Sequence, residues 1–301
     1  MRADIVQHLR CPVCHDPLAA AGRALRCPRG HSFDLARQGY ADLTAGRLTH
    51  DGDTPDMVAA RASLLAAGHF RVLEAALTTA LSPPAPGPAA SGLRSEATRE
   101  DAARQAPGPA RAEASANTVV VDVGAGTGHY LAKVLDARPD ARGLAVDVSK
   151  AALRRAARAH PRLAAVRADV WRRLPVADGA AGAVLNVFAP RSGAEFRRIL
   201  AADGVLVVAT PAAGHLGELV TTLDLVRVDP DKPDRLRAGL EPWFVPAGVE
   251  HHIWRLHLSA EEVRTVVAMG PSARHTDASQ LDTIPMEVTA AVDVSRWLPR
   301  P

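Results

Sequence analysis

The chain has 301 residues, of which 47% are hydrophobic, and it carries a formal net charge of +3. That length accommodates one large domain and a small one. No apolar run approaches the ~20 residues that a membrane-spanning helix needs, and no signal-peptide core follows the N-terminus, so we expect a cytoplasmic protein without membrane partners. Residues 1–50 carry seven Lys and Arg against four Asp and Glu, and the rest of the chain carries 29 of each. This local surplus hints at a polyanionic partner, although a solvated basic face would look the same.

The first 30 residues hold all three cysteines. Cys11 and Cys14 form a C-x2-C pair, and twelve residues later Cys27 and His31 form a C-x3-H pair. Three thiolates and one imidazole are a common tetrahedral ligand set for structural zinc, and four protein ligands leave no open position for catalysis. The alternative is a reduced or redox-active thiol pair, but the βαβ pattern typical of such redox motifs is absent. We predict a zinc ribbon over residues 1–48.

Residues 49–81 are predicted to form a helical connector. Two stretches of helical periodicity lie on either side of a break at Gly68, and Thr54 followed by proline is typical of a helix start. Phe70, just after the break, is most simply a core residue. An aromatic side chain directly ahead of a ligand-binding domain can also cover the ligand.

Residues 82–117 differ in composition from the rest of the chain. They are mostly Pro, Ala, Gly, Ser, Arg and Glu, with one Leu and no aromatic residue. Such a segment buries too little apolar surface to offset the entropy lost on ordering. We therefore predict a disordered linker or an insertion.

The segment 118–301 begins with a strand and a glycine-rich turn, Val119–Gly128. Four of its first five residues are Val, as expected for a buried parallel strand. The G-x-G-x-G spacing that follows is neither the dinucleotide fingerprint nor a P-loop. With Asp122 before it, the turn resembles the S-adenosylmethionine (SAM) loop of class I methyltransferases, although a bare glycine-rich turn can also be purely structural.

Strands and helices alternate after this turn. Asp147 ends the next strand, nineteen residues after Gly128, where a carboxylate can accept hydrogen bonds from ribose hydroxyls. Asp169 follows the third strand, where an acid would contact the adenine amine. We expect helices over 150–160 and 214–226, a fifth strand from Val205, and a reversed final hairpin. The predicted fold is an α/β, Rossmann-like class I SAM-dependent methyltransferase domain behind a small zinc ribbon.

The combination of these features resembles the RlmA family of large-subunit rRNA guanine-N1 methyltransferases, in particular its Gram-positive branch of tylosin-resistance enzymes. The resemblance covers nearly the whole chain except 82–117. Beside the ribbon and the G-x-G-x-G turn, it is carried by Gly68-His69-Phe70, Asn186-Val187-Phe188-Ala189-Pro190, Ala209-Thr210-Pro211, Gly214-His215-Leu216 and the Met269–His275 loop.

The resemblance implies a substrate, a mode of assembly and a set of ligand contacts. The substrate would be a guanosine of the 748 type in the hairpin 35 loop of 23S rRNA, and its methylation would hinder macrolides such as tylosin. Family members act as dimers whose ribbons line an RNA-sized cleft. Phe70 stands where the family usually has Tyr. Cys11, Cys14, Cys27 and His31 match the family's zinc ligands. Ten residues would contact SAM: Phe70, Asp122, Gly124, Gly126, Thr127, Gly128, His129, Asp147, Asp169 and His215.

No residue stands out as the base that removes the guanine N1 proton. Asn186 is the best-placed polar group for the base edge, although it can equally cap a turn. Arg274 and His275 can hold O6 or a phosphate, or can be surface residues. Two other functions stay open on sequence grounds: a small-molecule N- or O-methyltransferase with a structural ribbon, and a non-enzymatic RNA-binding protein with a degenerate SAM fold.

Overall fold

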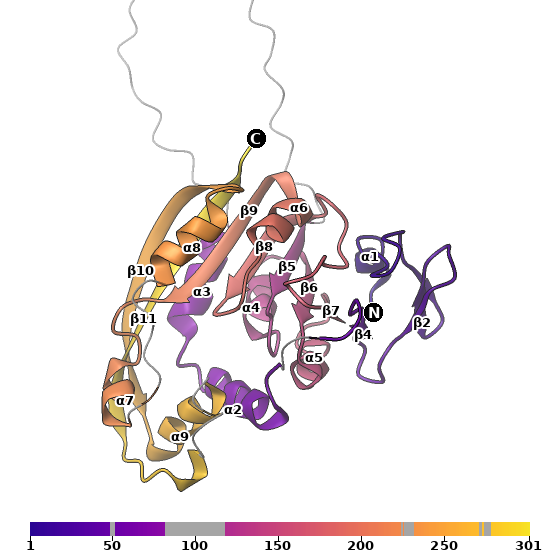
Figure 1. The fold of residues 1–301 in the computed structure, drawn as a ribbon. Helices are drawn as coiled ribbons and strands as arrows, with labels where there is room; N and C mark the ends of the chain where they lie inside the picture. The colour runs from indigo at the N-terminus through magenta and orange to yellow at the C-terminus, as the bar shows by residue number, and fades with distance from the viewer. Residues whose placement is uncertain (49–51, 82–117, 224, 226–231, 271–272, 274–277) are drawn as a thin grey trace, which may run out of the picture.

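The computed structural model describes residues 1–48, 52–81, 118–223, 225, 232–270, 273 and 278–301. The predicted linker 82–117 and the predicted roles of Arg274 and His275 lie outside the described residues. Within the described part, a small three-stranded sheet at the N-terminus stands beside an eight-stranded sheet that has helices on both faces (Figure 1).

The N-terminal module consists of helix α1 (Ala3–Val6) and three short antiparallel strands, β1 (Ala19–Ala21), β2 (Ala24–Arg26) and β3 (Ser32–Asp34). Strand β4 (Ala41–Asp42) then pairs in parallel with β7 at the edge of the large sheet. The small module is thereby tied to the large sheet by backbone hydrogen bonds.

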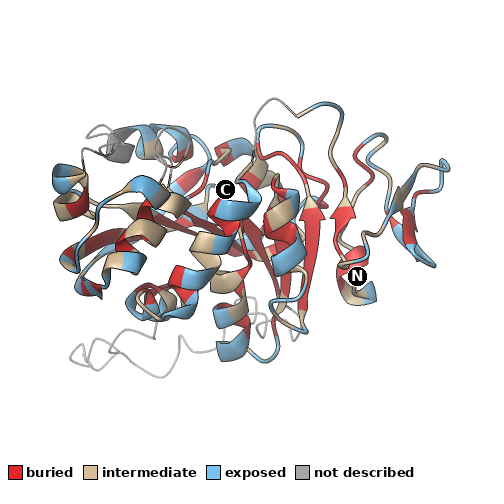
Figure 2. Cartoon of the chain, turned by 90° about the horizontal axis from the view of Figure 1, so that it is seen from below, coloured by how far each residue is buried: buried red, intermediate tan, exposed pale blue. Residues whose placement is uncertain are grey.

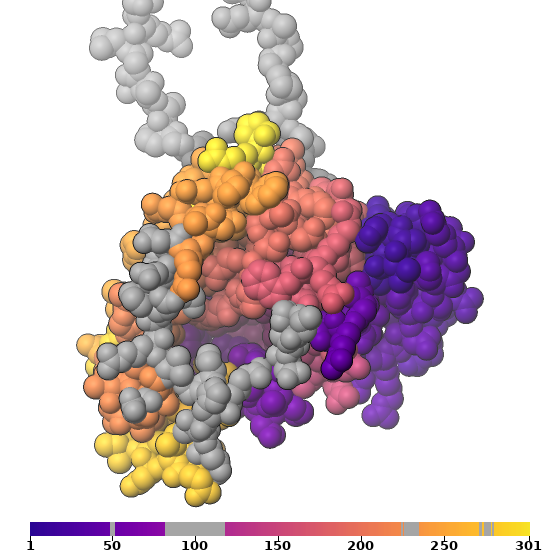
Figure 3. All heavy atoms as spheres, in the orientation of Figure 1, coloured from indigo at the N-terminus to yellow at the C-terminus, as the bar shows by residue number. Residues whose placement is uncertain are grey.

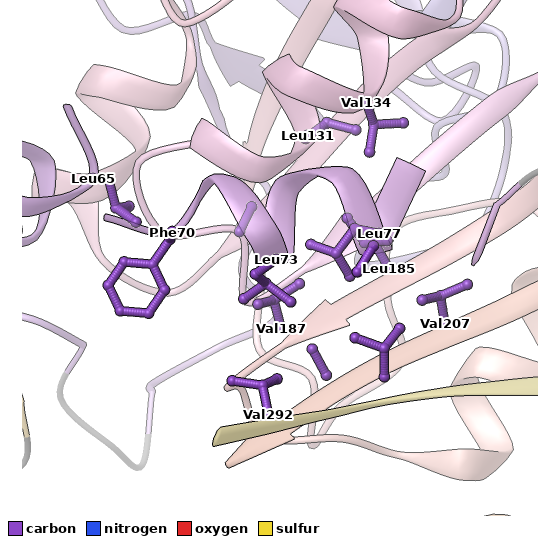
Figure 4. Packing of buried hydrophobic residues seen from close by; sticks show 14 of the residues in the cluster. Leu65, Phe70, Leu73, Leu77, Leu131, Val134, Leu185, Val187, Val207 and Val292 are labelled. Carbon is purple, nitrogen blue, oxygen red and sulfur yellow. The ribbon is translucent and has the colours of Figure 1, made fainter. Parts of the chain in front are cut away.

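The predicted connector helices are confirmed as α2 (Pro55–Ala66) and α3 (Arg71–Ala80). The Thr54 hydroxyl caps α2 by accepting a hydrogen bond from the Met57 N–H at 3.3 Å. Helix α3 buries Leu73 and Leu77 between helix α4 and the central strands (Figure 4). This helix is therefore part of the main hydrophobic core.

The large sheet has the strand order β10-β11-β9-β8-β5-β6-β7-β4. Its parallel strands are β5 (Val119–Val123), β6 (Arg142–Asp147), β7 (Leu163–Arg167), β8 (Ala181–Val187) and β9 (Leu200–Pro211), and the antiparallel hairpin at one edge is β10 (Phe244–Leu258) and β11 (Met286–Pro299). The helices are α4 (His129–Ala137), α5 (Lys150–Ala156), α6 (Gly193–Ile199), α7 (Gly217–Thr222), α8 (Lys232–Leu240) and α9 (Ala260–Met269), with a 3₁₀ turn at Ala278–Gln280. The predicted α/β alternation and the reversed final hairpin are confirmed.

Strand β5 is buried along its whole length, in keeping with the buried strands of the large sheet (Figure 2). Because side chains alternate across a strand, Val121 joins the cluster around Phe196 of α6, while Val120 joins the cluster around Leu131 of α4. Fully burying a side chain of this kind stabilises the fold by about 1.5–3 kcal/mol. The valine run thus fixes the strand that leads into the glycine-rich turn.

Candidate active site and metal centre

A cavity of about 1100 Å³ lies at the carboxyl ends of the parallel strands. The loops after β5, β6, β7 and β8 line it, together with residues of α2, α7, α8 and α9. In the space-filling view, the surface is hollowed between the central strands and the lower segment that carries α2, α7 and α9 (Figure 3). From β5 the chain proceeds to β6 and β7 on one side and returns to β8 on the other. Such a topological switch point is where open α/β sheets bind ligands.

The glycine-rich turn passes against this cavity with positive φ angles, +79° at Gly124, +54° at Gly126 and +75° at Gly128. The Gly124 N–H donates to the Val146 carbonyl at 2.8 Å. A Cβ at Gly124 would lie 2.2 Å from the Ala189 Cβ, so only glycine fits there. Gly128 faces α5 instead, and it is the one predicted SAM contact that does not line the cavity.

The carboxylate of Asp147 is fixed at the end of β6. One of its oxygens accepts from the Gly126 N–H and the other from the Ser149 N–H, both at 2.8 Å. Burial raises the pKa of Asp147, and these two hydrogen bonds oppose that rise. The end of β6 therefore presents a carboxylate of fixed orientation to the cavity. The same carboxylate holds the glycine-rich turn.

Asp122 lies one residue before the end of β5 and is 1% exposed. Among the described residues, none forms a hydrogen bond with its Oδ1 atom. Burial, followed by the nearby charge of Asp147, raises the pKa of Asp122 to about 8. A buried acid with an unsatisfied oxygen at a cavity wall fits a cationic ligand group, such as the amine of SAM.

Phe70 and Asp169 also line the cavity and are both nearly fully buried. The Phe70 ring packs edge-on against Trp254, with ring centroids 5.9 Å apart. Phe70 is thus a core residue that also forms part of the cavity wall. The Asp169 Oδ1 atom accepts from the Trp171 N–H at 3.0 Å, which shapes the loop after β7.

Two histidines reach the cavity from different elements, His129 at the start of α4 and His215 after β9. The His129 Nε2 atom lies 2.7 Å from the Glu74 carboxylate of α3. The His215 Nδ1 atom accepts from the Ala291 N–H at 3.2 Å, and its ring lies 5.9 Å from the Phe188 ring. Both rings line the cavity, and both are oriented by contacts with neighbouring elements.

A second cluster lies in the N-terminal module. The ligand atoms of Cys11, Cys14, Cys27 and His31 all lie within 4.8 Å of one another. The Cys27 Sγ atom lies 3.3 Å from the His31 Nδ1 atom and 3.6 Å from the Cys14 Sγ atom. Tetrahedral zinc with bonds of about 2.3 Å to sulfur and about 2.0 Å to nitrogen separates its ligand atoms by about 3.5–3.8 Å. The four side chains therefore fit one structural zinc ion.

Comparisons with known proteins identify both parts of the chain. A family model described as "RlmA, N-terminal" matches residues 9–44, and one described as "Methyltransferase domain" matches residues 120–204. A Streptomyces fradiae protein named 23S rRNA (guanine(748)-N(1))-methyltransferase is 47% identical over 93% of this chain and 91% of its own. A Micromonospora griseorubida protein, provisionally named for the same guanine-N(1) activity, is 52% identical over 99% of this chain and 100% of its own.

The chain belongs to this family of 23S rRNA guanine-N1 methyltransferases. It is a SAM-dependent methyltransferase of the class I fold with an N-terminal zinc ribbon, as the sequence predicts. Within the described residues, no helix combines the length and the apolar character needed to cross a membrane.

In this methyltransferase, Asn186 occupies a different place from the one expected for a residue at the base edge. Its side chain is fully buried and does not line the cavity. Its amide donates to the carbonyl oxygens of Val123 and Pro190, at 2.9 Å each. The geometry favours the turn-holding role over direct contact with substrate, and the catalytic role remains a prediction.

Sequence reasoning gave no role to three side chains that line the methyltransferase cavity: Trp171, Phe188 and Arg191. Each follows the carboxyl end of a parallel strand within a few residues. Large aromatic residues and an arginine at such positions are the signal that could have identified them.

Proposed function

We propose that this chain transfers the methyl group of SAM to N1 of a guanosine of the 748 type in the hairpin 35 loop of 23S rRNA. The observation that carries the proposal is the full-length match to the Streptomyces fradiae enzyme, whose name specifies that reaction. The cavity supports it, since nine of the ten residues expected to contact SAM line that single space.

In the proposed site, each wall residue has a chemical task toward SAM. Asp147 accepts hydrogen bonds from the ribose hydroxyls, Asp169 meets the adenine amine, and Asp122 faces the positively charged methionine end. Gly124 and Gly126 let the backbone approach the ligand without a Cβ in the way. Phe70, Thr127, His129 and His215 complete the wall.

Bound SAM supplies a methyl group already activated by its sulfonium. In the transfer, the N1–CH₃ bond of guanine forms as the C–S bond breaks, the sulfonium becomes a neutral thioether, and the N1 proton is released to solvent. The protein contributes chiefly by holding the guanine in line with the methyl group. A loop base must be splayed out of its stack to enter such a cavity.

We assign RNA recognition to residues 1–48, which precede the connector 49–81 and the catalytic domain 118–301. The exposed arginines of the ribbon, Arg23, Arg26 and Arg29, can contact phosphates. The enzyme would act as a homodimer in the cytoplasm, and its product would confer resistance to macrolides such as tylosin.

Methylation of a synthetic hairpin 35 RNA with labelled SAM tests the proposal. We expect incorporation of one methyl group at N1, and we expect Arg23→Glu with Arg26→Glu to weaken RNA binding strongly at low salt. The matched control reverses the charge of two exposed arginines of α5 by replacing Arg154 and Arg155 with Glu. Methylation of small molecules but not of the RNA would favour the alternative function and overturn this one.

A further inference from the structure

Two large aromatic side chains stand exposed at the cavity, on either side of the glycine-rich turn. Trp171, in the loop after β7, is 58% exposed, and Phe188, directly after β8, is 39% exposed. Both line the cavity. The chain contains only four Trp, five Phe and two Tyr, so exposing two of them at one opening points to a ligand that covers them.

Phe188 is held in place by its backbone. Its φ angle is +53°, a conformation that residues other than glycine rarely adopt. Its N–H donates to the Ala209 carbonyl at 3.0 Å, and its ring lies tilted by 36° to the His215 ring. Backbone strain of this kind persists where the surrounding structure enforces it, commonly at ligand sites.

Arg191 belongs to the same loop and also lines the cavity. Its guanidinium donates to the Ala189 carbonyl at 3.2 Å, and no carboxylate of the described residues pairs with it. Burial lowers the pKa of Arg191, but a guanidinium stays protonated at neutral pH. A half-buried cation with unused donors fits a ligand that presents an acceptor oxygen or a negative charge.

The cavity lies at the upper end of the size range of ligand pockets. Pockets for a single small ligand typically measure roughly 300–1,000 Å³, and this one measures about 1100 Å³. Trp171, Phe188 and Arg191 are not among the residues expected to contact SAM, so they mark the space left for the substrate.

We propose that Trp171 and Phe188 stack against the extruded guanine and that Arg191 donates a hydrogen bond to its O6 atom. This inference rests on the proposed function. When guanine N1 loses its proton, the negative charge is shared with O6, which lies next to N1 in the ring. A positioned guanidinium stabilises that charge and so eases the departure of the proton. Aromatic faces replace the stacking that the base loses on leaving its loop.

The test uses the full chain, a hairpin 35 RNA and SAM, with the variants Trp171→Leu, Phe188→Leu, Arg191→Gln and Arg191→Lys. Trp243→Leu is the matched control, because Trp243 is 42% exposed but lies outside the cavity. Circular dichroism and SAM calorimetry confirm that each variant folds and binds SAM. RNA carrying 2-aminopurine at the target position reports stacking of the extruded base by its fluorescence.

We expect SAM affinity to stay within about twofold of wild type in all variants that fold. Loss of an aromatic face weakens RNA binding by about 5- to 150-fold, from about 1–3 kcal/mol per stacked base, and abolishes the change in 2-aminopurine fluorescence. Arg191→Gln lowers kcat by about 10²–10³-fold, and its rate recovers as the pH rises, because hydroxide-promoted loss of the N1 proton then replaces the guanidinium. Arg191→Lys, which keeps the charge, retains more activity than Arg191→Gln.

Three results separate the possible failures. If Arg191→Gln keeps the kcat and the pH profile of the wild type, the proposed role of Arg191 is overturned. Unchanged RNA affinity and fluorescence in both aromatic variants overturn the stacking site. If the wild-type chain methylates no RNA while binding SAM, the proposed function fails, and this inference fails with it.

Discussion

The side-chain amide nitrogen of Asn186 lies 2.9 Å from the carbonyl oxygen of Pro190. The same nitrogen donates to the Val123 carbonyl at the end of β5, also at 2.9 Å. One buried amide therefore ties the glycine-rich turn to the loop that carries Phe188 and Arg191. This amide thus links the cofactor side of the cavity to its proposed substrate side.

Replacing Asn186 should act through that link. Asn186→Ala removes a donor from the buried bond to the Val123 carbonyl and from the partly buried bond to the Pro190 carbonyl, and we expect the free energy of unfolding to fall by about 1–3 kcal/mol. Asn186→Asp should be at least as severe, since it places a carboxylate against both oxygens. Urea denaturation measures the loss. Lost turnover in a variant of unchanged stability would instead indicate that Asn186 acts directly on the substrate.

Gly124→Ala should destabilise the protein more than any other glycine substitution in the turn. A Cβ at Gly124 meets the Ala189 Cβ at 2.2 Å, in addition to the cost of its positive φ. Gly179→Ala is the control, because Gly179 also has a positive φ but nothing within 4 Å of its Cβ position. We expect the control to lose about 1 kcal/mol and Gly124→Ala to lose several-fold more, with SAM binding abolished. Equal melting temperatures for the two variants would contradict the packing described here.

Much of the fold follows from local sequence. The valines of β5 and the cap at Thr54 are patterns that physical rules interpret directly, and both elements form as predicted. Element ends were less predictable. The helix expected over 150–160 ends at Ala156, the strand expected from Val205 begins at Leu200, and the helix expected over 214–226 is the shorter α7. Contacts between distant segments decide these ends, and no short pattern encodes such contacts.

Asp122 predicts a dependence of SAM affinity on pH. Its pKa is raised to about 8 in the folded protein, from 3.8 when unperturbed. A cationic ligand prefers the ionised carboxylate, so below pH ~8 the affinity should fall by up to tenfold per pH unit. Calorimetry between pH 6 and 9 checks this. Asp122→Asn should bind SAM weakly with a flat profile; a flat profile in the wild type would refute the assignment.

The same group makes a second prediction about stability without SAM. Because the folded pKa lies above the unfolded pKa, the protonated acid stabilises the fold at low pH, and that contribution is lost as the pH rises from about 4 to about 8. Asp122→Asn should therefore be more stable than wild type at pH 8 and similar to it near pH 4. Thermal unfolding at the two pH values measures the difference, and a variant less stable than wild type at pH 8 would contradict the sign.

Zinc removal should unfold the ribbon selectively. The module has only short strands, and its buried core includes Cys11 and Cys27 themselves. Any of Cys11→Ser, Cys14→Ser, Cys27→Ser or His31→Ala should lower the metal content from one zinc per chain toward zero. Elemental analysis of freshly purified protein measures this. A wild-type protein free of zinc and fully folded would contradict the metal centre.

The residues of the candidate site could be predicted where the chemistry of a residue type limits it to one kind of contact. The acids at the strand ends and two of the three turn glycines, Gly124 and Gly126, line the cavity, because the topology brings those ends together, whereas Gly128 faces α5. The sequence left Asn186 between the base edge and a turn cap, because the Val123 carbonyl that helps to fix its side chain belongs to a strand 63 residues away along the chain. Trp171 was missed for a related reason: its exposure at the cavity appears only once the loop after β7 is folded.

The most direct test of the proposed function is primer extension on 23S rRNA that was transcribed without modification and incubated with the purified chain and SAM. N1-methylguanine cannot pair, so reverse transcriptase should stop one nucleotide before a guanosine of the hairpin 35 loop, and the stop should vanish when SAM is omitted. An extension pattern identical with and without SAM, from a protein shown to bind SAM, would contradict the assignment.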